Sequence, residues 1–285
     1  MAQNLIVNAD DFGFSVGVTD GIVQAHQAGI LTSTTLMTTM PDAHRAVELA
    51  RRNHGLGVGI HLSLTQGTPL AGMDGPLFSP RGVFPPGVAK LIWRLTRDKS
   101  ILRQVRREWE SQINFAVSRG LQPTHLDSHK HIHHWPALGE IAIDLARQFN
   151  IRHIRCARER TIPGVSRPAI GYRVVSRMAH ALALRINQAG LTTTNWFFGL
   201  AATGRFSADV WRLLLTHLPP GTGEVMVHPG RPNGLNRSVT RLLAERQLEL
   251  DGLCDPAIKV LAASNSICLI HYGQLDSVLV EQAPG

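Results

Sequence analysis

Cysteine is scarce in this 285-residue chain, which contains only Cys156, Cys254 and Cys268. The three residues are far apart, odd in number and without the spacing of a metal-binding cluster. Neither a disulfide framework nor a cysteine-ligated metal site is therefore expected. This usage fits a reducing compartment such as the cytoplasm, and we expect the three thiols to lie in the protein core.

Long apolar runs are also missing. No stretch approaches the roughly 20 apolar residues that a membrane-spanning helix needs, and the N-terminus lacks the basic and apolar regions of a signal peptide. Hydrophobic residues make up 44% of the chain and charged residues 18%, which is typical of soluble globular proteins. We therefore expect no membrane span, a cytoplasmic location and a single domain over residues 1–285.

Acidic residues are outnumbered, since 29 Lys and Arg face 21 Asp and Glu, giving a net charge of +8. The excess comes mostly from arginine and is spread over many expected helices, with no basic tail and no interleaved aromatic residues. A nucleic-acid partner is therefore not expected. Attraction to an anionic substrate or to a membrane surface stays open.

Three common catalytic motifs are absent as well. The sequence has neither a G-x-G-x-x-G fingerprint nor a P-loop, so a nucleotide cofactor is unsupported. It also lacks the G-x-S-x-G turn of serine hydrolases. The chemistry must be sought in other residue types.

Histidine is the residue type that stands out, because five of fourteen histidines and one carboxylate fall between residues 124 and 134. If this stretch begins as a strand, His125, Asp127 and His129 share one face as far as the strand extends. His131 and His133 would continue the series only if the following loop stays extended. Such a face is costly to bury without partners, so it predicts a metal ion or a polar substrate. A His-rich surface loop is the alternative.

Strands and helices alternate along the whole chain, which predicts a parallel α/β architecture. The expected helices cover residues 15–28, 42–50, 101–117, 137–149, 174–186, 207–218 and 239–250. The expected strands cover residues 5–7, 33–39, 56–63, the His-rich stretch, 151–156, 194–200, 223–227 and 266–272. Polar residues follow several of these strands directly, which favours a single-domain, irregular (β/α) TIM-like barrel with seven or eight parallel strands over an open sheet.

The polar residues at these strand ends form a plausible catalytic set. Asp11, His61 and His129 would provide one carboxylate and two imidazoles, which is the usual layout of a catalytic metal with open positions. Asp10 could accept a proton from water, and His228 could protonate a leaving group. Asp127 could orient a histidine. Taken singly, each residue has a structural alternative: a helix-entry turn for the two aspartates, a core histidine for His61 and a turn residue for His228.

Five motifs also carry a resemblance to a known family. They are Ile-Val-Asn-Ala-Asp-Asp-Phe-Gly (6–13), Thr-Ser-Thr-Thr (32–35), Gly-Ile-His-Leu (59–62), Thr-His-Leu-Asp-Ser-His (124–129) and Val-His-Pro-Gly (227–230). In their order and spacing the chain resembles the YdjC/ChbG family of carbohydrate deacetylases from residue 4 to about residue 272. The resemblance implies a TIM-barrel-like fold, one divalent metal ion and removal of an N-acetyl group from an N-acetylglucosamine-type sugar such as diacetylchitobiose. It assigns the metal to Asp11, His61 and His129 and the general base to Asp10, and it suggests a homodimer.

One departure from the family pattern concerns the substrate. The chitooligosaccharide deacetylases typically carry three consecutive histidines where this chain has His129, Lys130 and His131. A lysine here is similar to the branch associated with hopanoid biosynthesis, which acts on an N-acetylglucosaminyl lipid. The segment 173–191 fits such a glycolipid, and it fits a buried helix equally well. We assign His125, Asp127, Lys130 and His131 to orienting the ligands or contacting the substrate.

The metal and the activity class each have alternatives. Two imidazoles favour Zn²⁺, whereas the family is often described with Mg²⁺. The competing classes are a metal-dependent phosphoesterase and a non-catalytic protein that binds sugar or nucleic acid. A dinuclear phosphoesterase would need more bridging ligands than the strand ends offer.

Overall fold

A curled parallel β-sheet forms the centre of the protein, in a computed structural model that describes residues 3–72, 75–78, 83–84, 87–167 and 169–277. The strands pair in the order β4-β3-β2-β1-β6-β5, and β7 pairs with the first residues of β1. All these ladders are parallel. The strands are β1 (Gln3–Phe12), β2 (Ser33–Leu36), β3 (Gly57–Leu62), β4 (Leu126–Ser128), β5 (Trp196–Phe198), β6 (Gly221–Val227) and β7 (Ile267–Leu269).

Regular pairing stops between β4 and β5. The segment between them is held by three isolated parallel bridges, Leu126↔Ile154, His153↔Thr192 and Glu159↔Phe197. The predicted strand over 151–156 is therefore an extended segment without a ladder of its own. The prediction of a parallel α/β fold is confirmed, but within the described residues the ladders form a curled sheet rather than a complete, regular TIM barrel.

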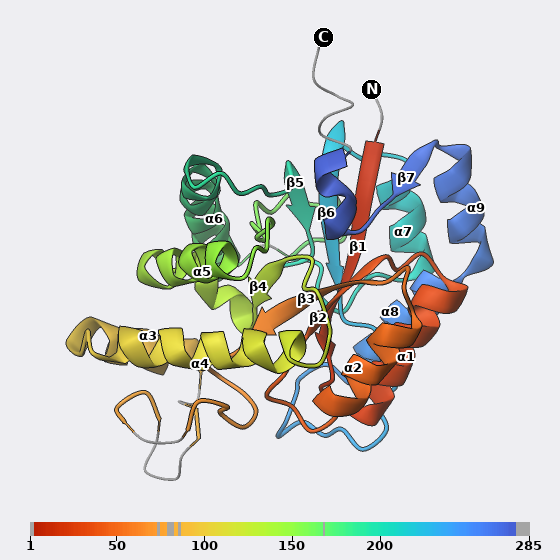
Figure 1. Cartoon of the computed structure of the whole chain (residues 1–285). Helices are drawn as coiled ribbons and strands as arrows, with labels where there is room; N and C mark the ends of the chain where they lie inside the picture. Colours follow the sequence, from red (N-terminus) through yellow and green to blue (C-terminus); the bar gives the residue numbers. More distant parts are fainter. Residues whose placement is uncertain (1–2, 73–74, 79–82, 85–86, 168, 278–285) are drawn as a thin grey trace.

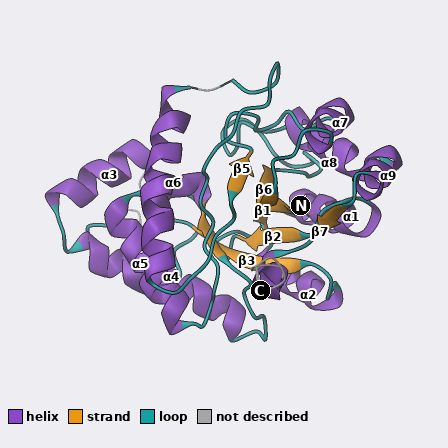
Figure 2. Cartoon of the chain, turned by 90° about the horizontal axis from the view of Figure 1, so that it is seen from above, coloured by secondary structure: helices purple, strands orange, loops and turns teal. Residues whose placement is uncertain are grey.

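Helices cover the outside of the sheet (Figures 1 and 2). One group packs beside β3, β4 and β5, and the other packs beside β1, β6 and β7. The first group is α3 (Val88–Arg97), α4 (Ile101–Val117), α5 (Pro136–Gln148) and α6 (Ile170–Gln188). The second is α1 (Val16–Ala28), α2 (Ala43–Arg52), α7 (Ala208–Leu215), α8 (Ala244–Cys254) and α9 (Pro256–Ser264).

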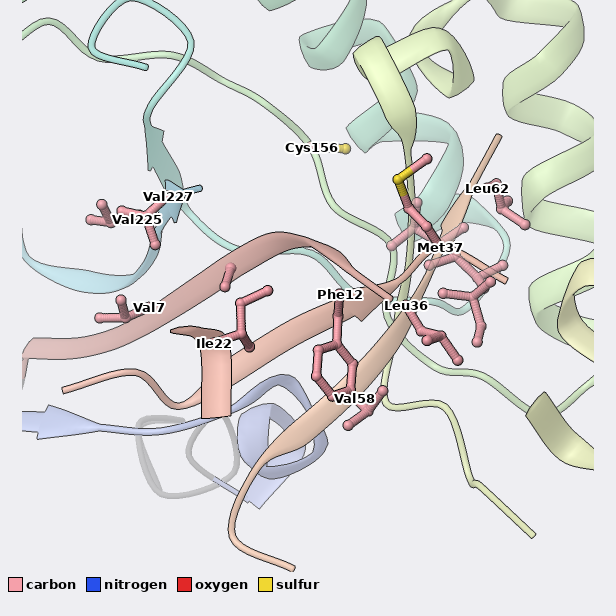
Figure 3. Close-up of a cluster of buried hydrophobic side chains, with 14 of the residues drawn as sticks. Val7, Phe12, Ile22, Leu36, Met37, Val58, Leu62, Cys156, Val225 and Val227 are labelled. Carbon is pink, nitrogen blue, oxygen red and sulfur yellow. The ribbon is translucent and has the colours of Figure 1, made fainter. Parts of the chain in front are cut away.

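The two faces of the sheet differ in chemistry because successive strand residues point to opposite sides. Along β1, Leu5, Val7 and Ala9 belong to the large apolar core beneath the helices (Figure 3). The alternating residues Asn8 and Asp10 are buried and polar, and they face the concave side, where charged groups from other strands gather. A glycine makes room there: a Cβ on Gly59 would lie 2.5 Å from the His125 ring.

Several local predictions are confirmed and others need correction. Ser15 caps α1 by accepting a hydrogen bond from the Val18 amide, and Pro136 opens α5 as expected. Helix α8 begins at residue 244 rather than 239, and α3 and α9 had not been predicted. The cysteine prediction was right only for Cys156, because Cys254 is half-buried and Cys268 is exposed. Within the described part of the chain, no helix is long and apolar enough to cross a membrane.

Candidate active site

Four strand ends bring the predicted residues to one edge of the sheet. Asp10 and Asp11 close β1, His61 lies near the end of β3, and His129 and His228 directly follow β4 and β6. The two aspartates and His61 are at most 5% exposed, whereas His129 and His228 are half-buried. The site thus has a buried acidic floor and a more open rim of imidazoles.

His61 is held in one orientation by a carboxylate. Its Nδ1 donates to Asp127 Oδ1 at 2.7 Å, and the Thr35 hydroxyl donates to Asp127 Oδ2 at 3.2 Å. This bond turns Nε2 toward the two aspartates, at 3.8 Å from Asp10 Oδ2 and 3.9 Å from Asp11 Oδ1. Burial alone would lower the pKa of His61, but the surrounding carboxylates, above all Asp127, raise it to about 9. A cation that binds Nε2 would displace that proton.

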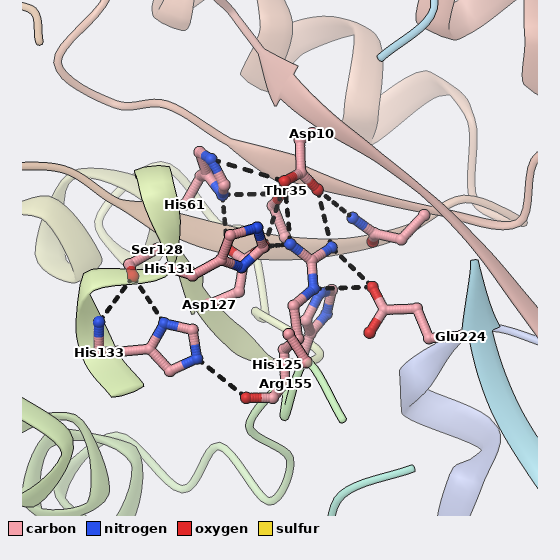
Figure 4. A network of polar contacts seen from close by, with 12 residues as sticks. Asp10, Thr35, His61, His125, Asp127, Ser128, His131, His133, Arg155 and Glu224 are labelled. Carbon is pink, nitrogen blue, oxygen red and sulfur yellow. Dashed lines mark hydrogen bonds and ion pairs between the residues drawn. The ribbon is translucent and has the colours of Figure 1, made fainter. Parts of the chain in front are cut away.

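Asp10 accepts hydrogen bonds from an arginine, Arg155, that was not predicted to be part of the site (Figure 4). Arg155 donates to both Asp10 oxygens, at 2.9 and 2.7 Å, and also lies 2.5 Å from Asp127 and 2.6 Å from Glu224. Burial opposes ionisation of Asp10, but Arg155 and then His61 outweigh it and hold the pKa of Asp10 well below its ordinary value. Asp10 is therefore ionised and held in one orientation. In the sequence, the one feature that could have indicated this role is that Arg155 lies within the strand expected over residues 151–156.

Asp11 differs from Asp10 in conformation and partners. Its backbone is left-handed, with φ at 72°, so its side chain diverges from that of its neighbour. Arg246 from α8 donates to Oδ2 at 2.5 Å, while Oδ1 is buried and has no hydrogen-bond partner among the described residues. A buried carboxylate oxygen without a partner is costly. Its position beside His61 Nε2 therefore fits a cation.

Helix α8 also fixes His228. Glu249 accepts the backbone N–H groups of His228 at 2.5 Å and Gly204 at 2.6 Å. The His228 ring keeps a buried Nδ1 without a partner among the described residues. Burial lowers the pKa of His228 to about 4, although Asp11 and Asp10 oppose the shift. A neutral His228 must first take up a proton before it can donate one to a leaving group.

The His-rich loop does not continue the strand. Strand β4 ends at Ser128, and Lys130 and His131 have left-handed backbones within the following turn, His129–His134. Non-glycine residues with this conformation are uncommon and cluster at functional sites. The condition under which His131 and His133 would extend the shared face is therefore not met.

The remaining histidines of this stretch fall into two groups. His129 stays at the site, with its ring centroid 5.8 Å from that of His61; its Nδ1 is 2.8 Å from the Thr65 hydroxyl, and burial lowers its pKa to about 3. The other rings make different contacts, although His131 stays beside the network of Asp10, His61 and Arg155 (Figure 4). His131 packs against Phe197, His133 bonds Ser128 and the Arg155 carbonyl, and His125 stacks on Tyr272 in the interior. Lys130 is exposed at the rim.

Among the described residues, the structure brings together one group of side chains that could hold a metal ion, and it shares only His61 with the set predicted from the sequence. Asp10, His61 and Asp127 have potential ligand atoms within 4.8 Å of one another. In this group, however, Asp127 is already bonded to His61 Nδ1 and Arg155, and Asp10 is bonded to Arg155. The set of Asp11, His61 and His129 offers less committed atoms, because Asp11 Oδ1 has no partner and each imidazole is held through Nδ1, leaving its Nε2.

A search against protein families matches the model of YdjC-like proteins over residues 4–264. The chain belongs to the YdjC-like family. Among curated proteins it is 34% identical to a carbohydrate deacetylase of Geobacillus stearothermophilus, with 95% of this chain and 98% of the relative covered. It is 33% identical to a carbohydrate deacetylase of Mus musculus, with 96% and 95% covered. It also resembles a solved structure from Enterococcus faecalis, provisionally named a cellobiose-phosphate cleavage protein, with 26% identity, a TM-score of 0.76 and coverage of 96% and 99%.

In this YdjC-like protein, Asp127→Asn is expected to weaken metal binding at the candidate site. An amide can present its NH₂ group to His61 Nδ1, which then loses its acceptor, so the imidazole is no longer fixed with Nε2 toward the aspartates. Loss of such an orienting partner typically costs about 10–100-fold in metal affinity. Zn²⁺ titration by calorimetry would measure the change, with the exposed Asp144→Asn as the control. Unchanged affinity would contradict an orienting role for Asp127.

A second prediction concerns Glu249, whose carboxylate fixes the backbone at His228. Glu249→Gln places an amide donor against one of the two backbone N–H groups, so one buried donor loses its partner. We expect the free energy of unfolding to fall by about 1–3 kcal/mol and kcat to fall more than KM rises. Urea unfolding and steady-state kinetics would test this, with the exposed Asp251→Asn of the same helix as the control. Equal stability and equal kinetics of Glu249→Gln and Asp251→Asn would refute the role of Glu249 in holding the backbone at His228.

Proposed function

We propose that this protein is a metal-dependent hydrolase that removes the N-acetyl group from an N-acetylglucosamine-containing sugar and releases acetate. One observation carries the proposal: an ionised aspartate oriented by arginine, Asp10, lies 3.8 Å from a carboxylate-held imidazole, His61. Hydrolysis of an acetamide needs a base for water and an electrophile for the carbonyl oxygen. The buried floor of Asp10, Asp11 and His61 would supply the base and would contribute ligands to a metal ion, which acts as the electrophile.

Membership of the YdjC-like family, whose curated relatives are named carbohydrate deacetylases, confirms the prediction of an enzyme that hydrolyses amide bonds. The finer proposal, a chitooligosaccharide such as diacetylchitobiose, rests on the family resemblance of the motifs. An N-acetylglucosaminyl lipid of the hopanoid type is the alternative substrate, suggested by Lys130. The homodimer stays a prediction.

For the metal we propose Asp11, His61 and His129 as ligands, and either Mg²⁺ or Zn²⁺ as the ion. The unpartnered Asp11 Oδ1 supports this set, as does the Nδ1 bond of each imidazole, which leaves Nε2 for the ion. When bound, such an ion polarises the acetamide carbonyl and acidifies the attacking water. Arg246 holds the second oxygen of Asp11 and so orients this carboxylate.

The proton transfers are assigned to residues outside the ligand set. Asp10 accepts the proton of the attacking water, and Arg155 keeps its carboxylate ionised and in place. His228, held by Glu249 through its backbone, is our choice of donor to the departing amine. Because burial keeps His228 neutral, the proton that it would pass to the amine is the one that Asp10 has taken from water. The products are acetate and a free amino sugar.

The direct test is acetate release from diacetylchitobiose, N-acetylglucosamine 6-phosphate and an N-acetylglucosaminyl lipid, each with and without EDTA. Release that EDTA abolishes and a divalent metal restores is the expected result, and the preferred substrate distinguishes the chitooligosaccharide from the glycolipid. p-Nitrophenyl phosphate serves as the comparison. Its hydrolysis without acetate release from any sugar would reject the deacetylase in favour of the phosphoesterase.

A further inference from the structure

A cavity of about 710 Å³ lies beside α6. Its lining comes from the first half of α6, from Glu159 and Thr161 on the preceding segment, and from Ala201 after β5. None of the catalytic or metal-ligating residues proposed above lines it. A cavity of this size is within the range of small-molecule sites, about 300–1,000 Å³.

The lining residues of α6 form one continuous helical face. Tyr172, Ser176 and His180 follow one another at intervals of four residues, and Arg173 and Arg177 lie beside them with the same spacing. Residues four apart are neighbours on a helix surface. Two guanidinium groups thus stand one turn apart at the cavity, next to a phenol and a hydroxyl.

These cations lack anionic partners. Among the described residues, no carboxylate lies within 4.0 Å of the Arg173 or Arg177 guanidinium, whereas Arg185 on the same helix pairs with Glu140 at 2.7 Å. Between residues 157 and 180 the sequence has five arginines and a single acid, Glu159. The cavity is therefore a place where positive charge is concentrated and left uncompensated.

The single acid of this segment is already engaged. Glu159 accepts the backbone N–H groups of Leu200 at 3.1 Å and Ala201 at 2.9 Å, and it has no cation partner among the described residues. Burial raises its pKa to about 7, despite these bonds. Glu159 thus shapes the wall formed by residues 199–201 and does not neutralise the arginines.

We propose that this cavity is a binding site for an anionic saccharide, a sugar ring that carries a phosphate or carboxylate group. The planar guanidinium groups of Arg173 and Arg177 match such an anion. The hydroxyl groups of Thr161, Tyr172 and Ser176 provide donors and acceptors for sugar hydroxyls. The site does not depend on the proposed deacetylation. Recognition of such a ligand would explain why residues 157–180 are basic.

The site also shares a wall with the catalytic centre. Tyr172 packs against the apolar cluster of Ala157, Phe197, Leu200 and Met226. On its other side, Phe197 lies 5.7 Å below the Arg155 guanidinium and 6.2 Å from the His131 ring, measured from ring centroids. A ligand in the cavity would therefore be separated from Arg155 by the side chains of Tyr172 and Phe197.

Calorimetric titration of the full chain with glucose 6-phosphate, glucuronate, glucose and inorganic phosphate would test the proposal. The double variant R173A/R177A is compared with R185A, which removes a paired arginine of the same helix. We expect the two anionic sugars to bind more tightly than glucose or phosphate, and R173A/R177A to weaken them at least about tenfold. R185A should bind as the original protein does. Acetate release from diacetylchitobiose without these ligands should be unaltered in both variants, since neither touches the proposed catalytic set.

The outcomes separate the components of the inference. Equal affinity for phosphate and glucose 6-phosphate would overturn the saccharide part, because only the anion would then be recognised. Equal affinity for glucose would overturn the role of the arginines. Binding that R173A/R177A leaves unchanged would place the ligand elsewhere, and no binding of any anionic sugar would reject the site. Circular dichroism would show that the variants are folded, as expected for exposed side chains.

Discussion

Replacement of Asp10 by asparagine is expected to lower kcat by about 10²–10⁴-fold, the range typical of general acid–base catalysis. The amide is isosteric and can still accept one of the two bonds from Arg155, while its NH₂ group faces the other guanidinium N–H, so we expect some loss of stability without unfolding. It cannot accept a proton from water, however, and it carries no charge. KM should change little, because Asp10 is not assigned to holding the sugar.

A measurement of metal affinity distinguishes loss of the base from collapse of the site. Zn²⁺ affinity of Asp10→Asn should stay close to that of the original protein, since Asp10 lies outside the proposed ligand set. Asp20→Asn, a surface aspartate in α1 that pairs with Arg45, is the control and should be fully active. An Asp10→Asn variant that turns over at the original rate with metal bound would remove Asp10 as the base.

Removal of the metal is expected to have an equally large effect. Exhaustive dialysis against a chelator should abolish acetate release, and one equivalent of a divalent ion should restore it. His61→Ala should prevent the restoration, because the proposed ligand set then loses the imidazole nearest to Asp10 and Asp11. His217→Ala is the matched control, since this histidine is exposed after α7.

Metal content and activity must be measured on the same samples. Mass spectrometry of the dialysed protein establishes that it is free of metal, and titration with Mg²⁺ and Zn²⁺ separates the two candidate ions. A metal-free sample that retains full activity would contradict the proposed mechanism. Restoration in His61→Ala with original affinity would instead contradict the ligand assignment and leave the hydrolase class intact.

The sequence predicted those parts of the site that follow directly from strand positions. Asp10, Asp11, His61 and His228 occur at the ends of strands that a short apolar run makes visible, and His129 follows the strand expected from the His-rich stretch. Parallel strands bring these ends to one edge, so their convergence follows from the fold class alone.

Arg155, Arg246 and Glu249 were missed because their roles depend on tertiary structure. Arg155 lies 145 residues from Asp10, and Arg246 lies 235 residues from Asp11. Arginine and glutamate on an expected helix or strand ordinarily face solvent. Only the curled sheet and the packing of α8 place these three side chains in the interior, and no periodicity in the sequence indicates it.

The His-rich loop shows where strand periodicity stops being informative. Asp127 was expected to orient a histidine, and the structure pairs it with His61 on the neighbouring strand. Two residues later, the left-handed Lys130 and His131 turn the chain, and the alternation ends. Left-handed lysine and histidine leave no signal of the kind that glycine does, so the fate of His131 and His133 could not be predicted.

The segment that carries Arg155 is held to its neighbours by single bridges rather than by ladders. Its register therefore depends heavily on the Arg155 guanidinium, which is clamped by Asp10, Asp127 and Glu224. Breaking such a buried charge cluster typically costs about 3–5 kcal/mol. The buried ion pairs around Asp10, the proposed base, thus also hold the segment between β4 and β5 in place. A relative of this protein that lost catalysis would therefore still need these charges, because their loss would destabilise this part of the sheet.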